Sequence, residues 1–232
     1  MPFYRYCGAD RPASFRLYQQ ASDPARRIDA CCASLAPFSG ADLLDVGAGN
    51  GFHALRFAST CRTVVAVEPD PAMRAQFAAA HAEAGSPANV TLFEGDAEAL
   101  PLPEQSIDSV HARYAYFFGT NACLPGCAEV RRVLRPGGSF LVIDSSNQGE
   151  MGALYQRYFP DVFRSQEGML RFWREQGFTH YLVETEWRTP DRATMAAAFA
   201  LEHPPDQVAE IMSLVSGTSL TCATHVFHWR KS

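Results

Sequence analysis

Short apolar runs alternate with amphipathic stretches along the first two thirds of the chain. Five runs rich in β-branched residues predict strands, at 41–47, 62–69, 89–96, 106–115 and 139–146. Stretches with helical spacing of apolar residues precede or separate them, at 24–36, 51–60, 71–85 and 127–134. This alternation predicts an α/β fold, a parallel sheet with helices on both faces.

Local signals place the ends and faces of these predicted helices. Asp23 is expected to cap the first helix, with Pro24 in its first turn. In the second helix, Phe52, Leu55 and Ala58 are expected to share one apolar stripe.

The last third of the chain follows a different pattern. We expect a helix over 169–178, an alternating strand over 180–188, helical residues over 191–216 and a final strand over 220–230. Two late strands separated by an insertion predict a hairpin-like addition at the edge of the sheet.

Composition limits the kind of protein. The chain has 232 residues, 47% hydrophobic and 19% charged, which predicts a single globular domain over 1–232. A net charge of −5 argues against nucleic acid as a partner. Without a long apolar run or a secretory signal, we expect a cytoplasmic protein that does not enter the membrane. Cys123 and Cys127 have no second ligand pair at suitable spacing, so no metal site is expected.

The single lysine, Lys231, excludes several enzyme classes. A Walker A loop needs a lysine beside its glycines, and a pyridoxal phosphate enzyme needs one for its Schiff base. Short-chain dehydrogenases use a Tyr-x-x-x-Lys pair, which cannot be built here.

A glycine-rich turn in LLDVGAGNG follows the first predicted strand. Glycines let a backbone turn tightly and approach a ligand closely. Glu68 ends the next strand, 21 positions after Gly47, where an acid can bind both hydroxyls of a ribose. Asp45 repels phosphate and suits a cation, and Phe52 stands where a dinucleotide fold needs a third glycine. The expected cofactor is therefore S-adenosylmethionine, and an NAD-linked oxidoreductase is disfavoured.

Four stretches in this order resemble one known family. LLDVGAGNG, VVAVEPD, EGDAEALPLPEQSID and LRPGG are similar to class I S-adenosylmethionine-dependent methyltransferases, of the small-molecule branch and of type 11/25. The resemblance covers about residues 40–145. It implies a Rossmann-like, seven-stranded sheet whose last strand is antiparallel.

The resemblance also implies where the cofactor's amino-acid end binds. Asp45, Gly47 and Gly49 would line the methionine end. His111 and Ala112, at the end of the fourth strand, would pass close to the sulfonium.

The nucleoside end is implied in the same way. Glu68 would bind the ribose hydroxyls, and Pro69 or Asp70 would flank the adenine. Asp96 would receive the adenine amino group, with a backbone contact from Ala97.

Catalytic residues are harder to identify, because methyl transfer depends largely on alignment. His111 is a candidate base because imidazole titrates near neutral pH, and Asp144, which follows the fifth strand, is a second. Tyr114 and Tyr116 are candidates to orient the acceptor. Arg113 is a candidate to bind a carboxylate of the cofactor or of the acceptor.

Three regions are expected within the domain. Residues 1–38 form an N-terminal helical lid whose Arg16 and Tyr18 bind the cofactor, and residues 40–145 form the cofactor-binding core. Residues 146–232 shape the acceptor pocket and supply the C-terminal strands. The aromatic cluster of 154–163 indicates an apolar or aromatic acceptor.

The expected reaction is methylation of a small-molecule acceptor, such as a natural product of secondary metabolism. O-methylation is favoured on base rates alone, and N- and C-methylation stay open. The Ala112–Ala115 segment lacks the Asp/Asn-Pro-Pro-Tyr/Phe tetrapeptide of enzymes that methylate amino groups of nucleic acids. A non-catalytic subunit or sensor that binds the same cofactor is the alternative, and a monomer or homodimer is expected.

Overall fold

The computed structural model describes residues 7–36, 38–163 and 166–232. Its centre is a seven-stranded sheet in the order β3-β2-β1-β4-β5-β7-β6. The strands are β1 (Asp42–Val46), β2 (Thr63–Glu68), β3 (Val90–Glu94), β4 (Ile107–Arg113), β5 (Leu134–Ser145), β6 (Thr179–Arg188) and β7 (Ser219–Arg230).

The strand directions confirm the predicted sheet. Strands β1 to β5 pair in parallel, because each connection returns through a helix or loop to the same edge. Strand β7 pairs antiparallel with both β5 and β6, and β6 lies at the edge. The hairpin-like addition predicted for the last third is therefore present.

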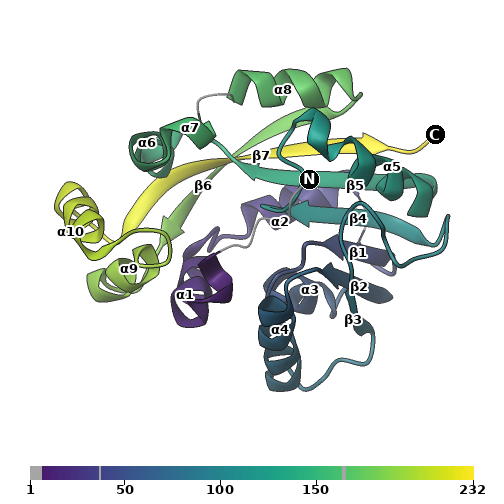
Figure 1. Cartoon of the computed structure of the whole chain (residues 1–232), viewed down its shortest axis with the longest axis horizontal. Helices are drawn as coiled ribbons and strands as arrows, with labels where there is room; N and C mark the ends of the chain where they lie inside the picture. The colour runs from purple at the N-terminus through teal and green to yellow at the C-terminus, as the bar shows by residue number, and fades with distance from the viewer. Residues whose placement is uncertain (1–6, 37, 164–165) are drawn as a thin grey trace.

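Helices cover both faces of the sheet, as Figure 1 shows. The described helices are η1 (Cys7–Ala9), α1 (Pro12–Ala21), α2 (Arg27–Leu35), α3 (Phe52–Phe57), α4 (Pro71–Glu83), η2 (Asn121–Cys123), α5 (Leu124–Val133), α6 (Gly149–Tyr158), α7 (Pro160–Phe163), α8 (Gln166–Glu175), α9 (Arg192–Phe199) and α10 (Pro205–Leu214). None of them is long and apolar enough to cross a membrane.

Side-chain alternation along the strands assigns residues to the two faces. On one face, Leu43 packs with Ile28 of α2 and Phe57 of α3. On the other face, Phe140 packs with Val130 of α5 and Trp173 of α8. We call them the α2–α3 face and the α5–α8 face.

A third apolar cluster lies beyond the carboxyl end of β5. It joins α1, α6, α9 and α10 to the end of β6 and the start of β7. Its aromatic members include Trp187 and Phe199, whose ring centroids are 5.0 Å apart. We call it the edge cluster, and Figure 1 shows its helices gathered at one end of the sheet.

Two local predictions near the N-terminus need correction. Asp23 does cap a helix, accepting bonds from the backbone N–H groups of Arg27 and Ile28 at 2.8 Å, but α2 begins only at Arg27. The delay follows from a tight turn in which Asp23 and Arg26 both have positive φ. The predicted stripe of the second helix was only partly right, because Leu55 and Ala58 are half-buried against the α2–α3 face whereas the buried residues are Ala54 and Phe57.

Later boundaries also differ from the predictions. Residues 191–216 form two helices, since consecutive prolines at 204 and 205 end one helical path and start another. Helix α5 begins at Leu124, before the predicted 127, and β5 begins at Leu134, before the predicted 139.

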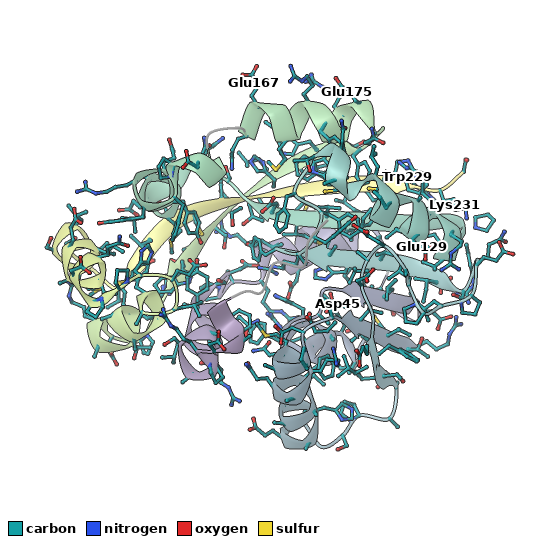
Figure 2. All side chains as sticks on the ribbon, viewed as in Figure 1. Asp45, Glu129, Glu167, Glu175, Trp229 and Lys231 are labelled. Atoms are coloured by element: carbon teal, nitrogen blue, oxygen red, sulfur yellow. The ribbon has the colours of Figure 1, made fainter. Side chains whose placement is uncertain are left out.

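The single lysine has a structural role at the amino edge of the sheet. Lys231 Nζ donates to the carbonyl oxygens of Arg131 and Leu134, both at 2.7 Å, at the end of α5. These carbonyls belong to the unpaired end of a helix, which a cation stabilises. Figure 2 shows Lys231 near the C-terminus, well away from Asp45 in the interior.

Candidate cofactor and acceptor site

The glycine turn leaves β1 at the carboxyl edge of the sheet. Gly47, Gly49 and Gly51 have φ values of 70°, 56° and 83°, which favour glycine. A Cβ at Gly47 would lie 2.4 Å from the Ala115 Cβ, and one at Gly51 would lie 2.7 Å from the Phe77 ring. A Cβ at Gly49 would meet nothing within 4 Å. The turn is therefore packed at both ends and open in the middle.

Asp45 lies directly below this turn, 3% exposed. Its Oδ1 accepts a hydrogen bond from His111 Nδ1 at 2.9 Å. Its Oδ2 is buried and has no hydrogen-bond partner among the described residues. Because an unpaired buried carboxylate oxygen is costly, this atom fits the positively charged amino group of a ligand.

His111 is held beneath the surface rather than at it. The side chain is 1% exposed and faces α3, with its ring centroid 5.1 Å from that of Phe57 and 5.7 Å from that of His53. Its contacts thus hold the Asp45 carboxylate in place. Ala112, the next residue, is fully buried and lies on the opposite face.

Glu68 closes the site at the end of β2. Its Oε2 accepts from the Gly49 N–H at 2.8 Å and its Oε1 from the Asp70 N–H at 2.9 Å. Burial raises the pKa of Glu68, and the two backbone hydrogen bonds oppose that rise. Each carboxylate oxygen can accept a further bond, so the group fits a pair of ribose hydroxyls. Pro69 is half-buried beside it.

Asp96 and Ala97 follow β3 at the same edge. Asp96 is exposed, and its Oδ1 accepts from the N–H groups of Glu98 and Ala99 at 2.8 and 3.0 Å. Ala97 is buried. This short capped turn presents a carboxylate to solvent just after β3, the strand beside β2, where the adenine is expected.

The segment after β4 is strained. Tyr114 and Tyr116 have φ values of 53° and 36°, a region that side chains other than glycine rarely adopt. Such strain concentrates at functional sites. Tyr114 is 44% exposed, with its hydroxyl 3.4 Å from Thr224 Oγ1. The Tyr116 hydroxyl lies 2.9 Å from Glu98 Oε1, which ties this segment to the loop after β3.

The two predicted bases lie on different faces. Asp144 ends β5 on the α5–α8 face and stands opposite His225 in the β5–β7 register. His111 stands opposite Asp45 on the α2–α3 face. Burial raises the pKa of Asp144 from 3.8 to about 6, partly offset by the hydrogen bond from the Ser145 N–H. The structure therefore does not bring His111 and Asp144 together.

The predicted lid residues both lie on α1 but point apart. Arg16 forms an exposed ion pair with Glu83 at 3.2 Å and lines a cavity of about 410 Å³ between α1, α3 and α4. Tyr18 contacts Tyr155 of α6 through their hydroxyls and joins the edge cluster. Residues 1–6 of the predicted lid lie outside the described residues.

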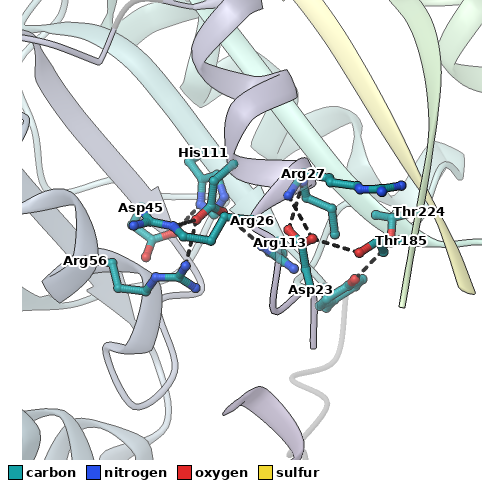
Figure 3. A network of polar contacts seen from close by, with 12 residues as sticks. Asp23, Arg26, Arg27, Asp45, Arg56, His111, Arg113, Thr185 and Thr224 are labelled. Atoms are coloured by element: carbon teal, nitrogen blue, oxygen red, sulfur yellow. Dashed lines mark hydrogen bonds and ion pairs between the residues drawn. The ribbon is translucent and has the colours of Figure 1, made fainter. Parts of the chain in front are cut away.

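Sequence reasoning missed two groups of residues. Asn50 links the glycine turn to α1, donating from Nδ2 to Gln19 Oε1 at 2.7 Å. Asp29 of α2 pairs with Arg26 at the start of the same helix, with Arg56 of α3 and with Arg113 of β4. These three arginines are labelled in Figure 3. Apart from the local Arg26–Asp29 pair, nothing in a single sequence signals these contacts, since they join elements that are distant along the chain.

This geometry defines a class of protein. An open sheet in this order, with a buried acid under a glycine turn and a second acid at the next strand end, fits a nucleoside cofactor with a positively charged amino-acid end. A family model described as a methyltransferase domain matches residues 43–138.

Relatives agree with that class. A ubiquinone/menaquinone biosynthesis C-methyltransferase, UbiE, of Paracoccus denitrificans is 35% identical over 170 residues, 70% of this chain. The protein of that name from Caulobacter vibrioides is 32% identical over 184 residues, 72% of this chain. The chain covers 65% of the first relative's length and 69% of the second's.

A solved structure agrees on the fold. The phosphoethanolamine N-methyltransferase 2 of Haemonchus contortus, in complex with S-adenosylhomocysteine, has a TM-score of 0.64 at 17% identity, with 97% of this chain and 58% of that one covered. The chain belongs to the S-adenosylmethionine-dependent methyltransferase family.

Proposed function

We propose that this protein transfers the methyl group of S-adenosylmethionine to a small-molecule acceptor that loses a proton, either a hydroxyl group or an acidic carbon. When bound, the cofactor supplies an electrophilic methyl group. Asp45 and the glycine turn hold its methionine end, and Glu68 and Asp96 hold its nucleoside. The acid arrangement at the ends of β1, β2 and β3 supports this orientation.

The single observation that carries the acceptor chemistry is Asp144. It stands at the carboxyl end of β5, and its pKa is raised to about 6 by burial. A carboxylate with such a pKa accepts a proton near neutral pH better than an ordinary aspartate. We place the proposed base at Asp144 and not at His111, because His111 is fully buried and bonded to Asp45.

Tyr114 and the edge cluster support a small, partly apolar acceptor. Tyr114 is exposed after β4, with its hydroxyl 3.4 Å from Thr224 Oγ1 of β7, and the edge cluster contributes aromatic groups from α1, α6 and α9. Oxygen stays the proposed position of methylation, and the names of the relatives make carbon the second candidate.

The test is turnover with a panel of small phenols, aliphatic alcohols and quinols, using S-adenosylmethionine with a deuterated methyl group. We expect S-adenosylhomocysteine to appear with a labelled product, whose fragmentation separates O- from C-methylation. Asp144→Asn should lower kcat by about 10²–10⁴-fold with KM for the cofactor unchanged. Asp206→Asn, on the first turn of α10, is the matched control.

Cofactor binding without turnover of any acceptor would favour the non-catalytic alternative. Full activity of Asp144→Asn would refute the assignment of the base.

A further inference from the structure

Arg113 is a buried arginine with one long ion pair and an unpaired Nε among the described residues. It ends β4, and its side chain is 3% exposed. Its Nε is buried and has no hydrogen-bond partner among the described residues. A guanidinium carries five N–H donors, and leaving them unpaired in the interior is costly. Such a group is suited to an anion that is not part of the chain.

The one ion pair of Arg113 in the described part of the chain is long and shared. Its Nη1 lies 3.5 Å from Oδ1 of Asp29. The same carboxylate already pairs with Arg26 at 3.1 Å and with Arg56 at 3.0 Å. Three guanidinium groups thus compete for one carboxylate. Asp23, the next acid of this network, is taken up by Arg27 N–H, Ile28 N–H and the Thr185 hydroxyl (Figure 3).

The charge of Arg113 affects the pKa of two neighbouring side chains. Burial lowers the pKa of Arg56, and Arg26 and Arg113 lower it further, while Asp29 opposes them. Burial also places the pKa of His53 well below its ordinary value, with Arg113 the next contribution. Arg113 therefore contributes to the lowered pKa of two neighbouring side chains, although burial is the main cause in both.

The strand register places Arg113 beside the glycine turn. Asp45 stands opposite His111 in the β1–β4 pairing. Two residues further along β4, on the same face as His111, is Arg113, and Gly47 is the first residue after the end of β1. The Tyr114 ring covers the guanidinium from one side, with Arg113 Cζ 5.3 Å from the ring centroid. The unpaired Nε of Arg113 and the unpaired Oδ2 of Asp45 thus lie on one face of two adjacent strands.

Arg113 is positively charged and Asp45 is negatively charged, which matches the carboxylate and the ammonium group of a bound α-amino acid. We propose that Arg113 binds the α-carboxylate of the methionine part of S-adenosylmethionine, while Asp45 takes its α-amino group. This extends the proposed function by assigning an anion subsite within the cofactor site. A carboxylate of the acceptor is the other source of the same chemistry. The cofactor is favoured because Arg113 shares a face with Asp45, whereas Asp144 lies on the opposite face.

The test compares two ligands that differ only in the carboxylate. Calorimetry measures the Kd of S-adenosylhomocysteine and of its decarboxylated analogue, which keeps the amine, for wild type, Arg113→Met and Arg113→Lys. Arg62→Met is the matched control, since Arg62 pairs with Asp42 and Asp108 at the amino edge of the sheet. Thermal unfolding checks that each variant is folded, and Arg113→Lys carries the comparison if Arg113→Met is not.

We expect Arg113→Met to raise the Kd of S-adenosylhomocysteine roughly 10- to 100-fold, as for a lost charge-assisted hydrogen bond. The Kd of the decarboxylated analogue should change less than about threefold. Arg113→Lys should bind S-adenosylhomocysteine more tightly than Arg113→Met, because it keeps the charge. Arg62→Met should bind both ligands as wild type does.

Other outcomes overturn the assignment. Equal weakening of both ligands would show that Arg113 supports the fold of the site and does not bind the carboxylate. Unchanged S-adenosylhomocysteine binding with a raised KM for the acceptor would move the anion to the acceptor. Wild-type protein that binds neither ligand would refute the proposed function itself, which is a different result from loss in the Arg113 variants alone.

Discussion

Replacing Gly49 by alanine should separate folding from cofactor binding. Gly49 has a φ of 56°, and a Cβ there would meet nothing within 4 Å. The substitution therefore adds a methyl group without any collision inside the protein. It places that methyl group in the open middle of the glycine turn, between Asp45 and Glu68.

The cost in stability follows from the backbone alone. An L-residue in the left-handed region costs about 1–2 kcal/mol relative to glycine. Gly40 supplies a matched control, because it has a φ of 69°, also meets nothing within 4 Å, and follows α2 before β1 starts. Gly40→Ala and Gly49→Ala should therefore lose similar free energies of unfolding.

The cost in binding should fall on Gly49→Ala only. Glycine at this position lets the backbone approach the cofactor, and its N–H also donates to Glu68 at 2.8 Å. An added methyl group should push the cofactor away from the backbone at position 49 and from Glu68. Cofactor affinity should then fall at least about tenfold, which corresponds to about 1.4 kcal/mol.

Urea denaturation and calorimetry with S-adenosylhomocysteine measure the two effects on the same samples. Gly49→Ala that binds as tightly as Gly40→Ala would refute the placement of the cofactor against this turn. A loss of stability several kcal/mol beyond that of Gly40→Ala would show that the space around position 49 is not open.

Four further predictions concern Glu68, Asp144 and Gly51. Glu68→Gln should weaken the binding of S-adenosylhomocysteine by about 1–3 kcal/mol, because an amide cannot accept both backbone hydrogen bonds. Calorimetry should also show wild-type affinity falling as pH drops through the raised pKa of Glu68, and Glu68→Gln should lack that dependence. Because burial raises the pKa of Asp144 to about 6, the folded state favours its protonated form, so denaturation should show wild type losing stability relative to Asp144→Asn as pH rises from about 4 to about 6. Gly51→Ala should lose about 2–4 kcal/mol of stability through its positive φ and its overlap with Phe77, and adding Phe77→Leu should restore part of that loss.

The order of the elements could be predicted, because it depends on local patterns. Runs such as LLDV and TVVAVE are apolar and β-branched, and glycine or proline follows each of them. These signals act within a few residues, so the strand and helix order, the parallel sheet and the antiparallel end of the chain were predicted correctly.

Helix faces and boundaries were less predictable, because they depend on partners. The stripe of Phe52, Leu55 and Ala58 fits helical periodicity, yet α3 buries Ala54 and Phe57. Leu55 and Ala58 are only half-buried against the α2–α3 face, and Phe52 and Leu55 line the cavity beneath α1. The position of α1, a separate part of the chain, thus decides which side of α3 is covered.

The sequence by itself determined the fold class, the glycine turn and the acids at the ends of β1, β2 and β3, since each depends on a few adjacent residues. Only the tertiary structure decided on which face of the sheet the other candidate residues, His111, Asp144 and Arg113, lie. Strand pleating puts His111 under Asp45 and Asp144 on the opposite face. Folding also buries Arg113 at the end of β4, with one long ion pair to Asp29 of α2 and with its Nε unpaired among the described residues. Both results depend on pairings between distant segments, which no local pattern encodes.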